Sequence, residues 1–249
     1  MLQTFARPRP KIMVVSHERS GTHFMMNAIA KCYGYVSRPW LNFDFELGLN
    51  FYDPQHLAAY FGQFANIPLA NVVKAHHSFA FFKDMFASLI RDFHVIYVYR
   101  DPRDVMVSYW KFLNQLSWHE GPKTATCSEF LRSAPAGQMM RYQYQQEDSV
   151  LHRWLRHVNG WTLDVPEDLK RHVTYVRFRD LARDFENVML GLADPLGEAP
   201  STIERPALHE NTVLPNAGVV GAHKEYLTMD DLHRIHDIAG TAMARLGFI

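Results

Sequence analysis

The sequence has few of the features that mark whole classes of protein. It holds only two cysteines in 249 residues, too few for a disulfide framework. Its formal net charge is zero, so it lacks the global basic field that attracts nucleic acid. No apolar run is long enough to span a membrane, and residues 1–10 lack the apolar core of a signal peptide. These absences favour a cytoplasmic protein with neither a nucleic-acid nor a membrane partner.

Linkers and repeats are absent as well. No Pro-rich or Ser-rich stretch, internal repeat or low-complexity run divides the chain. A chain of 249 residues is long enough to bury one well-filled core. We therefore expect a single domain over residues 1–249.

What the sequence does contain is a pair of similar segments, each with an apolar strand, a basic turn and an amphipathic helix. In the first, the strand covers residues 11–15, and Gly34 is placed to end the helix. The turn between them is Arg19-Ser20-Gly21-Thr22. The free N–H groups of a helix N-terminus bind phosphate, glycine lets the backbone approach it, and arginine adds a planar cationic fork. The first segment is therefore a candidate phosphate-binding loop.

The second segment has the same order of elements. Its strand ends at Arg100, and Asp101 and Pro102 are typical of the first positions of a helix. Ser108 follows two turns into that helix. Arg100 and Ser108 can both reach an anion above the carboxyl edge of the sheet, where ligands of open α/β sheets bind. Together the two segments predict a site for a nucleotide with phosphates at two separate positions.

Between these segments, residues 71–75 form a third predicted strand. The period of two in a strand places Lys74 and His76 on one face. A lysine and a histidine at a strand end form a suitable acid–base pair, because the ordinary histidine pKa near ~6.5 allows proton abstraction at neutral pH. His77 is a competing candidate, and the residues alone leave the choice between the two histidines open.

With these residues in view, the sequence resembles the sulfotransferases that use 3′-phosphoadenosine 5′-phosphosulfate (PAPS), of the cytosolic type and their bacterial relatives. Residues 19–22 resemble the loop for the 5′-phosphosulfate, and residues 99–104 with Ser108 resemble the 3′-phosphate site. Residues 73–76 resemble the segment with the catalytic histidine, and this resemblance selects His76. Three later segments match as well, namely residues 157–161, 178–181 and 218–224.

The resemblance implies a three-layer α/β/α fold with a mostly parallel central sheet, of the P-loop-like nucleotide-binding type. It implies in-line transfer of a sulfuryl group from PAPS to the hydroxyl of a small acceptor, with 3′-phosphoadenosine 5′-phosphate (PAP) as product and without a metal. His76 would be the general base, while Lys74 and Arg19 would stabilise charge on the leaving group. The implied donor-binding residues are Arg19, Ser20, Gly21, Thr22, His23, Phe24, Arg100, Ser108, Phe178, Gly218 and Lys224.

The sequence departs from the family pattern in its closing motif. Asn216 and Ala217 stand where a basic pair normally binds the 3′-phosphate, and His223 stands for a tryptophan. This weakens the expected 3′-phosphate site. Residues that could supply the missing charge are Lys224, Arg103 and Arg205.

Three further positions depart from the pattern in the donor site. Arg19 replaces a lysine, which keeps the charge but cannot donate a proton, so we expect its role to be electrostatic. Phe24 stands for a tryptophan and Phe178 for a tyrosine. For each of these two residues, two roles stay open: it flanks the adenine, or it is an ordinary aromatic residue of the core.

Aromatic residues are frequent in the segments 40–64, 79–90 and 112–144, which favours an apolar or aromatic acceptor over a polyanionic one. The spacing within 79–90 predicts mostly helix. Residues 224–233 partly resemble the short dimer motif of the cytosolic family, so a homodimer stays open.

Two other function classes stay open. A kinase-like P-loop phosphotransferase would share the first turn, but it needs a longer glycine-rich loop that ends in Gly-Lys-Ser/Thr. It also needs a strand-end carboxylate for magnesium, where this chain has Arg100. A nucleotide-binding module without catalysis would suit the altered closing motif, but it leaves Lys74 and His76 without a role.

Overall fold

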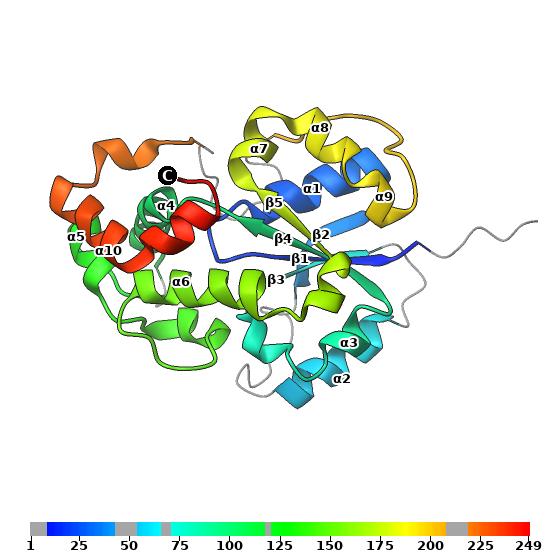
Figure 1. The fold of residues 1–249 in the computed structure, drawn as a ribbon, viewed down its shortest axis with the longest axis horizontal. Helices are drawn as coiled ribbons and strands as arrows, with labels where there is room; N and C mark the ends of the chain where they lie inside the picture. Colours follow the sequence, from blue (N-terminus) through cyan, green and yellow to red (C-terminus); the bar gives the residue numbers. More distant parts are fainter. Residues whose placement is uncertain (1–8, 43–53, 66–70, 118–120, 208–218) are drawn as a thin grey trace, which may run out of the picture.

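The protein is described by a computed structural model over residues 9–42, 54–65, 71–117, 121–207 and 219–249 (Figure 1). Five parallel strands form one sheet in the order β2-β3-β1-β4-β5. Their bounds are β1 Lys11–Val15, β2 Val36–Asn42, β3 Asn71–Ala75, β4 Phe93–Tyr99 and β5 Val173–Arg177. The strands predicted at residues 11–15 and 71–75, and the strand that leads into Arg100, are confirmed.

The sheet is covered on both faces, which is why its central strands are almost continuously apolar. Alternate residues of β1 point to opposite sides: Ile12 and Val14 belong to one apolar core, and Met13 and Val15 belong to the other. The first core is covered by α1 (Thr22–Tyr33), α7 (Phe178–Arg183), α8 (Phe185–Leu190) and α9 (Ala193–Leu196) (Figure 1). The second is covered by α2 (Pro54–Ala65), the 3₁₀ turn η1 (Phe79–Phe81), α3 (Phe86–Leu89) and the π-helical turn η3 (Gly160–Asp164). The predicted three-layer α/β/α architecture is confirmed.

A third apolar cluster lies at the end of the molecule toward which β4 runs (Figure 1). It contains the fully buried Trp154 and joins α4 (Pro102–Gln115), α5 (Cys127–Arg132), α6 (Val150–Asn159) and α10 (Met229–Arg245). Three 3₁₀ turns complete the described elements, namely η2 (Gly137–Tyr142), η4 (Glu167–His172) and η5 (Ala222–Glu225). This cluster forms one side of the region into which the carboxyl ends of the strands open.

Local sequence signals explain where helix α4 begins and where helix α1 ends. Asp101 caps α4 by accepting a hydrogen bond from the backbone N–H of Arg103, and Pro102 takes the first helical position. Gly34 ends α1 with a φ of 67°, a conformation that glycine adopts without strain.

Two stretches differ from the sequence expectation. Residues 79–90 contain only η1 and α3 rather than one longer helix, because Phe79, Phe81 and Phe82 are all buried and do not share one helical face. The aromatic stretch 40–64 contains most of helix α2, which its spacing did not indicate, while residues 43–53 lie outside the described residues. Across the parts of the chain that the structure describes, no helix has the length and apolar character needed to cross a membrane.

Candidate active site

The loop that joins β1 to α1 is sharply bent. Arg19 has a φ of 64° and Gly21 a φ of 105°, and the Arg19 conformation costs roughly 1–3 kcal/mol for a residue with a side chain. The hydroxyls of Ser16 and Thr22 lie 2.5 Å apart across the loop. The Ser20 hydroxyl is buried without a hydrogen-bond partner among the described residues. A buried donor of this kind costs free energy until a ligand accepts from it.

Gly21 is required here for two reasons. Its φ favours glycine, and a Cβ atom at this position would lie only 2.4 Å from Cδ2 of Phe178. Phe178 begins α7 at the carboxyl end of β5, so the sheet brings its ring onto the loop. Arg100 also contacts Phe178, because its guanidinium carbon lies 4.6 Å from the centroid of the Phe178 ring.

Arg19, Arg100 and Ser108 are brought together at the ends of β1 and β4. Arg19 Nε donates to Ser108 Oγ at 3.3 Å, and Arg100 Nη1 donates to the backbone oxygen of Arg19 at 3.2 Å. The Arg19 guanidinium also lies 4.4 Å from the ring centroid of Phe112. The two segments predicted to bind separate phosphates therefore meet at one place.

The environment of the two arginines favours an anion. Burial and the neighbouring Arg100 lower the pKa of Arg19 to about 10. Burial also lowers the pKa of Arg100, which is 4% exposed, against the opposing effect of Asp104 and Asp101. Arg100 Nε, like Ser20 Oγ, is a buried donor without a partner in the described residues. An anion between these groups would offset both costs.

A buried carboxylate in the same loop escaped the sequence analysis. Glu18 accepts from Arg153 of α6 through two hydrogen bonds of 2.6 and 2.8 Å, and from Tyr109 at 3.0 Å. Burial alone would raise the pKa of Glu18, but the Arg153 guanidinium holds it well below its usual range. His17 Nε2 accepts a further hydrogen bond from Arg153 at 2.9 Å, and burial lowers the pKa of His17 to about 4. The acidic residue inside a basic turn was the only sequence signal for this network.

His76 is hydrogen bonded to the same loop. Its Nδ1 lies 2.8 Å from the backbone oxygen of Ser16, and because a carbonyl only accepts, Nδ1 carries the proton. The backbone oxygen of His76 accepts from His157 Nε2 at 3.1 Å, and His157 Nδ1 accepts from the hydroxyl of Tyr97 at 3.0 Å. Burial lowers the pKa of His157 well below its ordinary value, so this ring stays neutral.

His77 points elsewhere. Its ring packs edge-on against Phe81 and Tyr142, with centroid distances of 4.9 and 5.3 Å. Lys74 is partly exposed and stands beside Val14 in the register of β3 and β1. Of the two histidines, His76 is therefore the one that is hydrogen bonded to the β1–α1 loop.

The remaining predicted residues lie around this centre. Ser20 and Thr22 are buried in the loop, and His23 is partly exposed in the first turn of α1. Phe24 is buried 6.1 Å from the ring of Phe185, with the Arg205 guanidinium 5.3 Å from its centroid. Gly218, with Asn216 and Ala217, lies outside the described residues.

The described part of the closing motif is attached to α4. Asp104 accepts from the backbone N–H of Gly221 at 2.8 Å and from His223 at two atoms, the backbone nitrogen and Nδ1. Arg100 Nη2 donates to the backbone oxygen of Val219 at 2.9 Å. Lys224 lies on the wall of a hollow beside Arg100.

Comparison with known proteins agrees with this geometry. A family model described as the sulfotransferase domain matches residues 9–208. The chain belongs to the sulfotransferase family. The matched residues include all five strands and both predicted phosphate-binding segments, so the resemblance seen in the sequence is confirmed. The protein is accordingly a transferase enzyme.

Solved structures share its fold. A mouse sulfotransferase complexed with PAP is 19% identical, with 94% of this chain and 84% of that chain covered at a TM-score of 0.63. A sulfotransferase from Alicyclobacillus acidocaldarius is 16% identical, with 96% and 94% covered and a TM-score of 0.57. A retinol dehydratase in complex with androsterone and PAP is 15% identical, with 94% and 80% covered and a TM-score of 0.57.

Proposed function

We propose that this sulfotransferase takes its sulfuryl group from PAPS and transfers it to the hydroxyl of a small, apolar or aromatic acceptor, releasing PAP. The observation that carries the proposal is the meeting of Arg19, Arg100 and Ser108 beside a loop to which His76 is hydrogen bonded. Cationic side chains and a base at one strand edge are what transfer between an anionic donor and a hydroxyl requires.

The donor fits the residues present. The unsatisfied Ser20 hydroxyl and the backbone of Gly21 and Thr22 form a cradle for the 5′-phosphosulfate, which supplies the sulfuryl group when bound. Arg100 and Ser108 would bind the 3′-phosphate. The PAP found with the mouse sulfotransferase and the retinol dehydratase supports this choice of nucleotide.

His76 would act as the general base. Because the Ser16 carbonyl holds the proton on Nδ1, the lone pair of the imidazole is on Nε2, which can accept the proton of the acceptor hydroxyl. His157 fixes the backbone of His76 and stays neutral itself, so it does not compete for that proton.

Arg19 and Lys74 would stabilise negative charge on the leaving phosphate. An arginine keeps its proton at neutral pH even with a pKa of about 10, so the contribution of Arg19 is electrostatic. Arg153 compensates the negative charge of Glu18. The Glu18 carboxylate therefore does not cancel the positive charge of Arg19.

Aromatic side chains next to His76 support an apolar acceptor. The centroid of the Tyr142 ring lies 5.6 Å from that of His76. The adjacent residue His77 packs against Phe81, which in turn packs against the exposed Tyr144 at 5.4 Å. The retinol and androsterone bound to retinol dehydratase are of the same apolar class.

Calorimetric titration without magnesium tests the donor first, with PAP as ligand and ATP as control. Micromolar binding of PAP and weak binding of ATP are expected. A preference for magnesium-ATP would contradict the proposal and favour a kinase-like phosphotransferase. Transfer from PAPS to a panel of phenols and hydrophobic alcohols then tests the acceptor class, and turnover only with polyanionic sugars would contradict it.

A further inference from the structure

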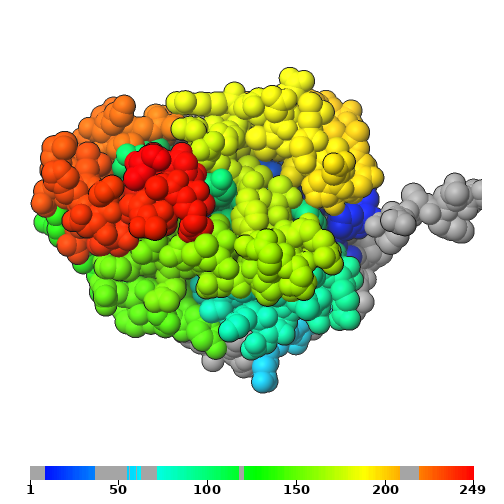
Figure 2. All heavy atoms as spheres, in the orientation of Figure 1, coloured from blue at the N-terminus to red at the C-terminus, as the bar shows by residue number. Residues whose placement is uncertain are grey.

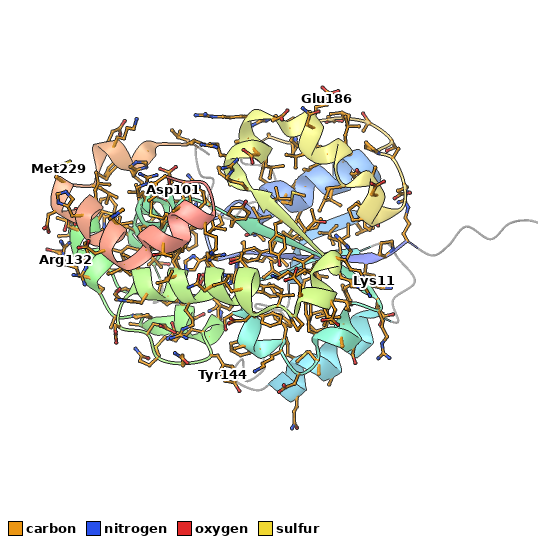
Figure 3. The ribbon with its side chains drawn as sticks, in the orientation of Figure 1. Lys11, Asp101, Arg132, Tyr144, Glu186 and Met229 are labelled. Atoms are coloured by element: carbon orange, nitrogen blue, oxygen red, sulfur yellow. The ribbon has the colours of Figure 1, made fainter. Side chains whose placement is uncertain are left out.

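A hollow of about 230 Å³ opens beside Arg100. It lies between the first turn of α4, helix α7, the closing segment from Val220 to Lys224, and Phe248 near the C-terminus. Figure 1 shows the C-terminus close to α4 and facing α7, and Figure 3 labels Asp101 at this end of α4. Since a water molecule takes about 30 Å³ in the liquid, the hollow has room for a phosphate group and part of a sugar.

The walls of the hollow are strongly basic. Its cationic side chains are Arg100, Arg103, Arg179, Arg183 and Lys224, and its carboxylates are those of Asp101 and Asp104. Both carboxylates are already occupied. Asp101 binds Arg103 through contacts of 2.5 and 2.9 Å, and Asp104 binds the Gly221 and His223 N–H groups described above.

The cations at the rim of the hollow have a distant carboxylate or none beside them in the described residues. Arg179 comes no closer than 3.8 Å to Asp180, and that carboxylate accepts from Arg177 at 2.9 Å. Within the described ranges, no carboxylate forms an ion pair with Arg183 or Lys224. Arg179, Arg183 and Lys224 are exposed at the rim, and Arg100 is buried at the base. Such an arrangement attracts an anion.

Two residues connect this hollow to the β1–α1 loop. Arg100 lines the hollow and donates to the backbone oxygen of Arg19, while Phe178 lines the hollow and lies against Gly21. A ligand with its 5′-phosphate on the loop could therefore extend into the hollow. PAP carries one more phosphate than adenosine 5′-phosphate, at the 3′ position of the same ribose.

We propose that Arg179 and Arg183 of α7, together with Lys224, bind the 3′-phosphate of the donor nucleotide. They would supply the charge that the sequence lacks at Asn216 and Ala217. Arg179 and Arg183 are four residues apart and so lie on one side of their helical turn. Arg103 does not take this role, because Asp101 and the backbone oxygen of Phe248 already accept from it. The inference rests on the proposed function and adds two residues, Arg179 and Arg183, to its donor site, where the family resemblance had already placed Lys224.

Two ligands that differ only in the 3′-phosphate test this assignment. PAP and adenosine 5′-phosphate are titrated into the wild type, into Arg179→Ala/Arg183→Ala and into Lys224→Ala. We expect the double variant to lose about tenfold or more in PAP affinity, since hydrogen bonds to charged groups are the strong ones. Its affinity for adenosine 5′-phosphate should stay within about twofold of wild type, and Lys224→Ala should show a smaller loss of the same selectivity.

Arg91→Ala/Arg171→Ala is the matched control. Both arginines are exposed near the amino ends of β4 and β5, so the control removes the same charge at the opposite edge of the sheet. It should leave both affinities unchanged. If Arg179→Ala/Arg183→Ala loses affinity for the two nucleotides equally, or for neither, the assignment is overturned. Binding of PAP by the wild type would in that case still support PAPS as the donor. A wild type that binds neither nucleotide would overturn the proposed function and the assignment together.

Discussion

The Oδ1 atom of Asp104 lies 2.7 Å from Nδ1 of His223, and this contact joins the first turn of α4 to the closing segment. The same carboxylate also accepts from the backbone of Gly221, while Arg100 donates to the backbone of Val219. The closing segment is therefore attached to the helix that carries Ser108. Nothing in the sequence indicated that Asp104 and His223 would be in contact.

Asp104→Asn should weaken PAP binding by about tenfold, because an amide cannot accept from all three N–H groups at once. Calorimetry measures the affinity, and hydrogen exchange of residues 219–227 reports whether the segment has loosened. The exchange of α10 serves as the internal reference. Unchanged exchange and unchanged affinity would show that the contact does not position the segment.

His76→Ala should reduce turnover by at least about 10²-fold while PAP affinity stays within about twofold, since a general base acts on the acceptor proton and not on the donor. His77→Phe is the matched control, because the His77 ring packs among aromatic side chains. Single-turnover transfer from PAPS measures the rate. Near wild-type transfer by His76→Ala would assign the base to another residue.

Arg100→Met should lower PAP affinity by about tenfold to a hundredfold. A hydrogen bond to a charged group contributes roughly 1.5–3 kcal/mol, and about 1.4 kcal/mol corresponds to tenfold in affinity. Methionine keeps the packing against Phe178, so the circular dichroism spectrum should not change. An unaltered PAP affinity would remove Arg100 from the nucleotide site.

Arg153→Met should destabilise the fold by about 3–5 kcal/mol, because it leaves Glu18 as a buried charge without its partner. Glu18→Gln/Arg153→Met should recover part of this loss. Urea unfolding at neutral pH measures both free energies. If the single variant is as stable as the wild type, the pair does not hold the loop.

Stability should also depend on pH through Glu18. Its folded pKa lies below the ordinary value of 4.5, so its contribution is fully present above pH 4.5 and is lost as the pH falls toward the folded pKa. Glu18→Gln should therefore show a shallower decrease of unfolding free energy below pH 4.5 than the wild type. Parallel decreases in the two proteins would contradict the depressed pKa.

Local signals were sufficient for much of the fold and for the place where the candidate site residues meet. The apolar run at residues 11–15, the turn that ends in Gly21 and the Asp101–Pro102 helix start each depend on neighbours in the chain, and each lies where the pattern indicated. Parallel strands place their carboxyl ends together, so the order of elements alone indicated that Arg19 and Ser108 would lie close together. The choice of His76 over His77 came from the family resemblance and not from the spacing.

The contacts that escaped prediction join residues far apart in sequence. Glu18 and Arg153 are 135 positions apart, and Asp104 and His223 are 119 apart. No spacing rule links such positions, because their distance is set by how α6 and the closing segment pack against the sheet. For the same reason the arginines of α7 became candidates only once the hollow beside Arg100 was known. Figure 2 shows the yellow α7 region and the red C-terminal residues on one face of the molecule.

The closeness of Arg19 and Arg100 has a thermodynamic consequence for the free enzyme. Arg100 is buried and Arg19 is partly buried, and the two cations repel each other, so an anion bound between them would stabilise the folded state. A nucleotide present at a hundred times its dissociation constant would add about 2.7 kcal/mol to the unfolding free energy. The melting temperature therefore reports how much of the anion site is occupied. Inorganic phosphate or sulfate in a buffer would bind the same site and reduce the rise in melting temperature that the nucleotide causes.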